Sequence, residues 1–173
     1  PIIAIDILYN STESIAGFQF DVTGMTVLNA FGGEAESAGF MISSSETTVL
    51  GFSLTSNPIP AGSGILIQLE ITGDPADACV DDNSVILSNL GGEAIPFEVS
   101  DCLTINAGAG CIDETACNYN ANAVADDGSC WNASDGCSCD DVEGAEVDCS
   151  GVCDGSAVED ECGACDDDAE NDC

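Results

Sequence analysis

The stretch SIAGFQFDV, residues 14–22, alternates apolar and polar side chains and decides the fold class. In an extended strand successive side chains point to opposite faces, so such alternation is typical of a strand with one buried face. The inward set is Ala16, Phe18, Phe20 and Val22. Gln19 and Asp21 fall on the opposite face, so residues 14–22 predict a half-buried strand.

The same alternation recurs along the first 105 residues. Residues 48–54 are predicted to point Leu50, Phe52 and Leu54 inward, and residues 65–71 do the same with Ile65, Ile67, Leu69 and Ile71. Further strands are expected at residues 2–9, 26–30, 40–43, 85–88 and 97–105. Gly, Pro and Asn turn signals separate them, and no long helical period appears. About eight strands in about 105 residues predict an all-β, antiparallel β-sandwich.

The charge of the chain has one sign. Among 173 residues there is no Lys, Arg or His, against 33 Asp and Glu, which gives a net charge of −33. Every carboxylate must therefore be solvated, hydrogen-bonded, protonated or bound to a metal ion. Self-repulsion of this size opposes compaction unless salt or divalent cations offset it.

The missing cations exclude whole classes of function. Nucleic acid and anionic membrane surfaces need Lys and Arg for phosphate contacts. Without His or Lys there is no imidazole base, nucleophile–imidazole pair, phosphate-binding lysine loop or Schiff base. Carboxylate chemistry survives, but nine aromatic residues suggest no aromatic-lined cleft. We expect the protein not to be an enzyme.

Twelve cysteines in so short a chain indicate an oxidising compartment. We therefore expect a secreted, extracellular or cell-surface protein. No apolar run approaches the roughly 20 residues that span a bilayer, so membrane insertion is not expected. The sequence opens directly into a strand-like run, which suggests a mature or excerpted region of a longer secreted precursor.

The composition changes near Asn106. Residues 1–105 hold two cysteines and nearly all the large apolar side chains, whereas residues 106–173 hold the other ten cysteines and 19 of the acids. The first region can bury a core, and the second must be held by covalent or metal cross-links. The predicted domains are a β-sandwich at 1–105 and two cysteine-rich acidic repeat regions at 106–131 and 132–173.

The sandwich region resembles the cohesin-like domains of large secreted proteins of marine bacteria. The resemblance covers roughly residues 1–105 and is carried by IAGFQFDVTG at 15–24, GGEAESAGF at 32–40 and TVLGFSLTSNPIPAGSGILIQLEI at 48–71. It implies a jelly-roll-like β-sandwich. Cohesin domains of cellulosomes bind dockerin modules, so the resemblance also implies a docking role, although that partner is often missing in the broader family.

Residues 111–130, CIDETACNYNANAVADDGSC, resemble a short repeat found in surface proteins of marine bacteria. The segment gathers oxygen ligands of the kind that Ca²⁺ prefers, without the spacing of an EF-hand. The candidate metal ligands are Asp113, Asn118, Asn120, Asp126 and Asp127. The alternative is that these residues only form turns.

Residues 137–173 resemble the DCxGVCxG arrays of large marine surface proteins, with a recurring unit at 148–154 and 161–166. A zinc site at Cys149, Cys153, Cys162 and Cys165 is the alternative to disulfides, which an oxidising compartment favours. We expect these cysteines to be disulfide-bonded: Cys79, Cys102, Cys111, Cys117, Cys130, Cys137, Cys139, Cys149, Cys153, Cys162, Cys165 and Cys173. Near-neighbour pairs are favoured: Cys79–Cys102, Cys111–Cys130, Cys149–Cys153 or Cys153–Cys162, and Cys165–Cys173.

Three functions stay open. The leading hypothesis is a structural segment of an extracellular filament, sheath or adhesive surface protein, stabilised by Ca²⁺ and disulfides and contacting copies of itself. The second is a cohesin-type binding module for a dockerin-like partner or a glycan, and the third is an accessory domain of a hydrolase. An exposed strand edge would serve the first, and residues 2–9 are the candidate strand for edge pairing.

Overall fold

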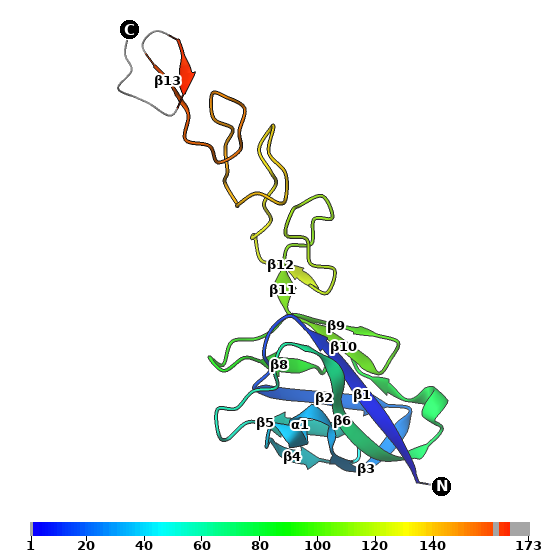
Figure 1. The fold of residues 1–173 in the computed structure, drawn as a ribbon. Coiled ribbons are helices and arrows are strands. Elements are labelled where there is room, and N and C mark those ends of the chain that lie inside the picture. The colour runs from blue at the N-terminus through cyan, green and yellow to red at the C-terminus, as the bar shows by residue number, and fades with distance from the viewer. Residues whose placement is uncertain (1, 161–162, 167–173) are drawn as a thin grey trace. The chain divides into compact units, whose positions relative to one another are not determined.

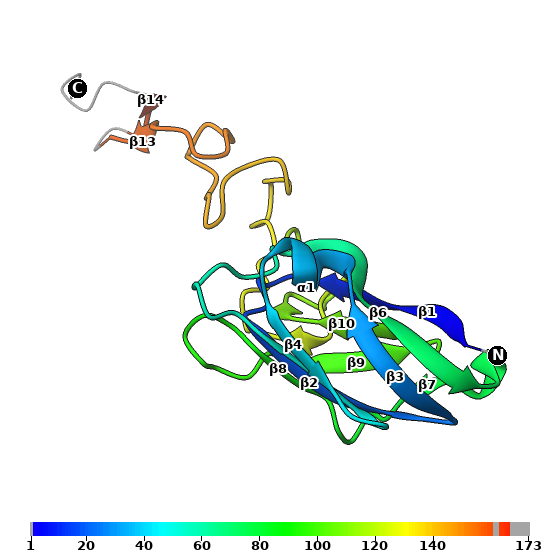
Figure 2. The ribbon, with the colours of Figure 1, turned by 90° about the horizontal axis from the view of Figure 1, so that it is seen from below.

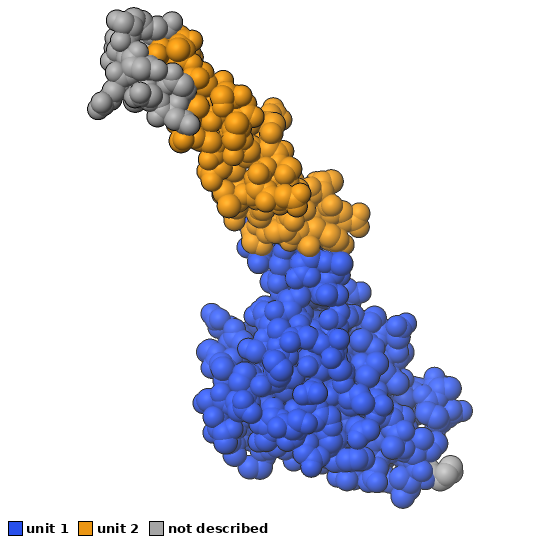
Figure 3. Space-filling model, viewed as in Figure 1, with its two compact units in different colours: residues 1–112, 120–128 blue, residues 113–119, 129–173 orange. Residues whose placement is uncertain are grey.

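The alternating stretch at residues 14–22 forms strand β2 (Gly17–Thr23) in the computed structural model, which describes residues 2–160 and 163–166 (Figure 1). Its inward residues Phe18, Phe20 and Val22 are each at most 2% exposed. The chain divides into two compact units (Figure 3). Unit 1 comprises residues 1–112 and 120–128, and unit 2 comprises residues 113–119 and 129–173.

Two five-stranded sheets make up most of unit 1. Their elements are β1 (Ile3–Ser11), β2, β3 (Met25–Phe31), β4 (Met41–Ser44), β5 (Thr48–Phe52), β6 (Gly62–Gly73), β7 (Cys79–Val80), β8 (Ile86–Ser88), β9 (Phe97–Ser100) and β10 (Thr104–Ala107). The first sheet has the order β3-β6-β1-β10-β9. The second has the order β4-β5-β2-β7, and β8 also pairs with β2. The two sheets face each other (Figures 1 and 2), which confirms the predicted all-β sandwich. Every strand pair within them is antiparallel except β1 with β10.

The core lies between the sheets. Phe18 and Phe20 of the second sheet stack with ring centroids 6.0 Å apart, and Phe18 stacks equally on Phe40. Ile67 and Leu69 of the first sheet are fully buried in the same cluster. Burying a side chain of this size contributes about 1.5–3 kcal/mol, so the hydrophobic effect holds unit 1 together.

The prediction for residues 48–54 was wrong about which side chains point into the core. Val49 and Gly51 point inward and are buried, whereas Leu50 and Phe52 lie on the outer face. Gly51 faces the Phe18 ring, and a Cβ there would overlap it. The large aromatic side chain of β2 thus occupies the volume that a side chain of β5 would need. The strand also ends at Phe52, which leaves Leu54 64% exposed.

An irregularity in β6 moves Ile65 to the outer face, again contrary to the prediction. The register with β1 shifts between Ile7 and Leu8, so that Ile7 pairs with Ile67 and Leu8 with Ile65. Leu66 is the extra residue of this β-bulge and is fully buried, as is Ile67. Two consecutive inward residues are possible only because the bulge interrupts the alternation.

Strand β1 lies between β6 and β10, but its two pairings differ in length. It pairs with β6 from Ile3 to Ser11 and with β10 only from Leu8 to Ser11. The prediction that residues 2–9 offer an edge for strand pairing is therefore wrong for Leu8 and Tyr9, whose second edge is covered by β10. For Ile3–Ile7, beside which β10 does not extend, it stays a prediction.

Two further segments differ from their predictions. Residues 97–105 form a hairpin of β9 and β10, because Asp101 and Cys102 both adopt positive φ (49° and 59°) and turn the chain. The hairpin loop has three residues, 101–103, because Ser100 pairs with Thr104. Residues 32–40 contain the short helix α1 (Gly33–Ser37), although the sequence shows no long helical period there, and the Gly32 N–H at its N-terminus donates to Glu36 Oε2 at 2.6 Å.

The segment 120–128 returns to unit 1. Strand β12 (Ala125–Asp126) pairs in parallel with β11 (Ala109–Gly110), and Val124 N–H donates to Gly108 O at 3.1 Å. This places part of the CNYNANA motif beside the end of the first sheet.

Unit 2 is built from turns. Its only strands among the described residues are β13 (Val158–Glu159) and β14 (Cys165–Asp166), which pair with each other. In that same described part, the buried apolar residues are Ala116 and Ala145. Hydrophobic burial therefore contributes little to unit 2, as its composition implied.

Candidate functional site

The outer face of the second sheet carries exposed apolar side chains. Pairing places Met41 beside Phe52 in one row, and in the next row it places Gln19 between Leu50 and Ile86. Met41 is 50% and Ile86 58% exposed. We call this set of four apolar side chains the apolar face: Met41, Leu50, Phe52 and Ile86.

A shallow hollow of about 250 Å³ lies within the apolar face. Gly17 stands in the row of Phe52 and Ser88, and a Cβ on it would approach Ser88 Oγ to 2.9 Å. Because Gly17 has no side chain, the sheet surface is open beside the Phe52 ring. An apolar side chain of a partner could enter this hollow.

Polar groups adjoin the apolar face along β5. The Thr48 hydroxyl donates to Asp21 Oδ1 at 2.6 Å, and both residues lie on the outer side of the sheet. A second hollow of about 190 Å³ is lined by Gln19, Leu50 and hydroxyl-bearing residues of β4 and β5. The face thus combines four apolar side chains, with the Gln19 amide among them, and adjoining hydroxyls and one carboxylate along β4 and β5. Protein-docking surfaces likewise combine apolar and polar groups.

Sequence reasoning missed this face because it placed Leu50 and Phe52 in the core. One signal was available. The alternation VLGF offers two inward pairs, Val49 with Gly51 or Leu50 with Phe52, and hydrophobicity alone favours the second. A large inward Phe18 on the neighbouring strand would have favoured the glycine.

The five predicted metal ligands are divided between the two units. Asp113 and Asn118 belong to unit 2, whereas Asn120, Asp126 and Asp127 belong to unit 1. Three of them, Asp113, Asn120 and Asp126, stabilise local turns. Asp113 Oδ1 accepts from Thr115 N and Oγ1, which lowers the pKa of Asp113, chiefly through the hydroxyl.

Asn120 and Asp126 act similarly, since Asn120 Oδ1 accepts from Asn122 N and Asp126 Oδ1 from Gly128 N. These contacts are those of the turn-forming alternative. Asn118 instead joins two segments of the motif: it donates to Ser129 O at 2.7 Å and accepts from Trp131 N at 3.0 Å. The Ca²⁺ site at these residues stays a prediction.

Among the described residues, one group of three acidic or cysteine side chains lies close enough to hold a metal ion: Cys137, Asp141 and Cys153. Its two cysteines are bonded to each other in a disulfide, so they offer no thiolate ligands. Cys149 and Cys165, two of the four cysteines of the zinc alternative, are likewise bonded to each other.

The described cysteines are all in disulfides. Cys79–Cys102 is confirmed, and it joins β7 of the second sheet to the β9–β10 turn of the first. Cys111 and Cys130 are also disulfide-bonded, whereas Cys162 and Cys173 lie outside the described residues. The other predicted near-neighbour pairs of Cys149, Cys153 and Cys165 were wrong.

Three bridges in unit 2 overlap along the chain. We call them the bridge ladder: Cys117–Cys139, Cys137–Cys153 and Cys149–Cys165. Each bridge begins two or four residues before the previous one ends. The prediction of near-neighbour pairs was wrong because the loops that the disulfides close overlap: the first cysteine of each bridge lies inside the loop closed by the previous bridge. Cysteine spacing alone does not reveal such a connectivity.

A twelve-residue repeat underlies the last two bridges, which both span 16 residues. Asp148 Oδ1 accepts from Val152 N at 2.9 Å, and Asp160 Oδ1 accepts from Ala164 N at 2.9 Å. The residue before each of these donors is a glycine with positive φ: 85° at Gly151 and 81° at Gly163. The repeat is therefore in register at Asp148 and Asp160, one residue before the predicted start at residue 161.

The carboxylate of Asp148 organises its own loop. It accepts from Ser150 Oγ at 2.7 Å and from the backbone N–H of Ser150, Val152 and Ala157 at 2.9–3.2 Å. These bonds, the Ser150 hydroxyl first, hold the pKa of Asp148 below its ordinary value. Its role is structural.

In the part of the chain that is described, no helix has the length and apolar character needed to cross a membrane.

Comparisons with known proteins assign no family. No protein-family model matches the chain, and no curated protein matches it. Two solved structures are similar in fold. One is the crystal structure of a complex between a variant of CaDoc0917 and CaCohA2 at pH 5.5, at 14% identity and a TM-score of 0.42, covering 56% of this chain and 82% of that one. The other is the solution structure of CaCohA2 from Clostridium acetobutylicum, at 13% identity and a TM-score of 0.36, covering 60% and 74%.

Proposed function

We propose that unit 1 is a binding module of an extracellular protein and that it docks a partner protein through the apolar face. The observation that carries this proposal is the exposure of Met41 and Ile86 on the face of the second sheet that also carries Leu50 and Phe52. Exposed apolar groups clustered within a polar rim are typical of interaction sites.

The charge of the chain defines the partner. With 33 carboxylates and no cation, this protein repels acidic surfaces and attracts basic ones. The fitting partner is a protein module that presents apolar side chains to the hollow at Gly17 and Lys or Arg to Asp21 at the rim. A dockerin-like module is the class that the sequence resemblance implies. The disulfides support an extracellular setting, since they persist in oxidising compartments.

The test compares two faces of the same domain. The full chain and its variants are immobilised and exposed to the secreted fraction of the source cells. A retained protein is identified, purified and titrated by calorimetry. Leu50→Ser/Ile86→Ser should weaken its binding at least tenfold, because these side chains line the hollow of the apolar face. Leu8→Ser, a matched change on the opposite sheet, should leave it unchanged. Equal loss in both variants, or no loss in either, contradicts the proposal.

The bridge ladder favours a second candidate function, a structural segment of an extracellular filament, sheath or adhesive surface protein. A covalently cross-linked unit with almost no core suits a connecting element better than a ligand site. Self-association of the purified chain at millimolar Ca²⁺, measured by sedimentation and electron microscopy, would support this reading. Dispersed monomers under those conditions count against it.

A further inference from the structure

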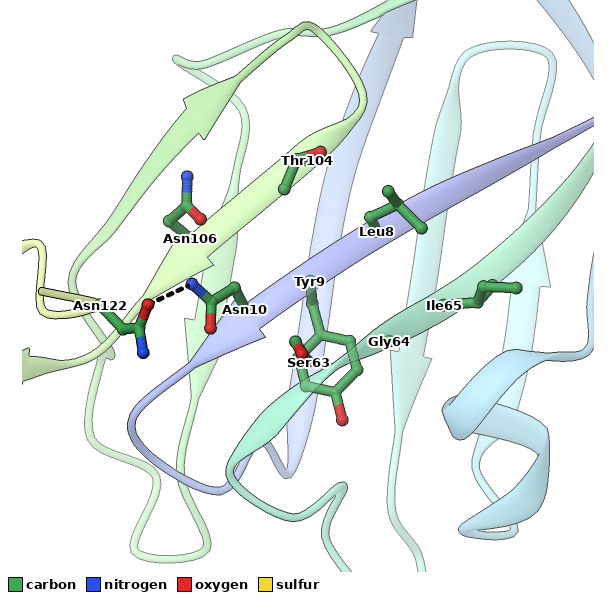
Figure 4. Close-up of a pocket in the computed structure, with 9 residues that line it drawn as sticks. All are labelled: Leu8, Tyr9, Asn10, Ser63, Gly64, Ile65, Thr104, Asn106 and Asn122. Atoms are coloured by element: carbon green, nitrogen blue, oxygen red, sulfur yellow. Dashed lines mark hydrogen bonds between the residues drawn. The ribbon is translucent and has the colours of Figure 1, made fainter.

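A second groove lies on the outer face of the other sheet, β3-β6-β1-β10-β9. It has a volume of about 550 Å³ and is drawn in Figure 4. We call it the amide groove and define it by six outward side chains from β1, β6, β10 and the returning segment: Leu8, Asn10, Ile65, Thr104, Asn106 and Asn122. It is separate from the apolar face, which belongs to the second sheet.

Strand register assembles the groove. Leu8 pairs with Ile65 on one side and with Thr104 on the other, which gives an apolar floor next to a hydroxyl. In the next row Asn10 pairs with Asn106. The β-bulge of β6 brings Ile65 to this face, since without it Ile65 would point into the core.

The returning segment closes one end of the groove. Asn122 lies in the loop before β12, and its Oδ1 accepts from Asn10 Nδ2 at 3.1 Å (Figure 4). Asn106 Nδ2 donates to Ser100 Oγ at 2.9 Å. The amides of Asn10 and Asn106 are thus each fixed by one hydrogen bond, which lowers the entropy lost when a ligand binds.

The fixed amides keep capacity for a ligand. Among the described residues, no side-chain hydrogen bond uses Asn122 Nδ2, or the Oδ1 atoms of Asn10 and Asn106. The groove therefore offers donors and acceptors within one row. Tyr9 lines the groove through its backbone, because its side chain is 4% exposed and its hydroxyl donates to Pro60 O at 3.4 Å.

The available chemistry selects a neutral, hydroxyl-rich ligand. An amide donates and accepts at once, so it matches a pair of adjacent hydroxyl groups. The aliphatic floor of Leu8 and Ile65 matches the C–H surface of a sugar ring. Phosphate, sulfate or carboxylate groups would need a cation, and the chain has none. Glu98, which pairs with Asn106 and lines the adjoining small hollow, further repels anions.

We propose that the amide groove binds a neutral glycan. The volume of about 550 Å³ lies in the range of about 300–1,000 Å³ typical of ligand sites. The groove lies on the surface of the sheet, so a glycan chain can continue beyond the sugar that it holds.

The test uses affinity electrophoresis of the full chain in gels that contain one soluble polysaccharide each: galactomannan, xyloglucan, starch or, as the anionic arm, alginate. Retardation by at least one neutral polysaccharide and none by alginate is expected. Calorimetry with an oligosaccharide of the retarding polymer then gives the dissociation constant. Asn122→Ala should raise this constant about five- to tenfold, the usual effect of losing one hydrogen bond.

Matched variants separate a binding effect from a folding effect. Asn29→Ala removes an exposed amide from the same sheet, outside the groove, and should leave binding unchanged. Leu8→Asp places a charge on the floor and should abolish retardation, while circular dichroism checks that the fold persists. Migration unaffected by every neutral polysaccharide overturns the proposal, as do equal effects of Asn29→Ala and Asn122→Ala, or a preference for alginate. The variant Leu50→Ser/Ile86→Ser should bind glycan normally, so this proposal and protein docking can fail independently.

Discussion

Reducing the bridge ladder should lengthen unit 2 several-fold under tension. In the oxidised chain, the shortest covalent path from Cys117 to Cys165 runs through three bridges with Cα–Cα distances of 5.0, 5.4 and 5.7 Å. Only six residue steps join these bridges, because each bridge starts shortly before the last one ends. At about 3.3–3.6 Å per extended residue, the path measures about 37 Å.

The reduced chain has no such shortcut. Its 48 residue steps between the same two cysteines extend to about 165 Å. Reduction should therefore release about 130 Å of contour length. A variant that lacks one bridge, Cys149→Ser/Cys165→Ser, should release about 20 Å without reductant, because only the last loop can then open.

Optical tweezers measure these lengths on the full chain held at both ends. The background Cys79→Ala/Cys102→Ala keeps the sandwich bridge from contributing to the change. Unit 1 unfolds in either redox state and serves as the internal length standard. A release well below 100 Å on reduction refutes the overlapping connectivity, and so does stepwise lengthening of oxidised unit 2.

Four further outcomes are expected. Gly51→Ala should destabilise unit 1 by about 1–3 kcal/mol in urea unfolding, because its Cβ would overlap a core ring, whereas Gly64→Ala, with no contact closer than 3.6 Å, should cost far less. Cys79→Ala/Cys102→Ala should remove about 3 kcal/mol, the entropy of a loop with a sequence separation of 23, and lower the melting temperature. The pKa of Asp148 is lower in the folded loop than in the unfolded chain. Its contribution to the stability of the loop is therefore present above the unfolded-state pKa and is lost as the pH falls through the folded-state pKa. Amide exchange in its loop should accelerate in acid, and Asp148→Asn should show fast exchange at neutral pH. Chelation with EDTA should lower the melting temperature far more than added salt does. An unchanged melting temperature would contradict the prediction that Ca²⁺ stabilises the protein.

Much of the sandwich could be predicted from local alternation. Residues 14–22 place Phe18 and Phe20 inward, as predicted, because their polar neighbours leave one choice of face. In VLGF both faces are apolar or small, so the choice depends on the side chains of the neighbouring strand. The side chain that decides it is Phe18 of β2, and the pairing of β2 with β5 cannot be read from the local sequence.

The candidate sites were harder to predict than the core. The apolar face depends on the facing of β5, and the amide groove depends on the bulge that turns Ile65 outward. Asn122 belongs to a segment whose composition matches the cysteine-rich tail, yet it hydrogen-bonds Asn10, which is 112 residues away. No local pattern carries a contact at that separation.

The central place of β1 has a consequence for how the chain is made. Its parallel neighbour β10 lies almost 100 residues later, so at a synthesis rate of about 5–20 residues per second the strand waits about 5–20 seconds for its partner. During that interval the edge of β1 at Leu8–Ser11 has no β10 to pair with. Pairings between such distant segments fold slowly. A chain released before residues 104–107 would present an open sheet edge. The first sheet is therefore completed only when the last part of the sandwich sequence, β10, has been made.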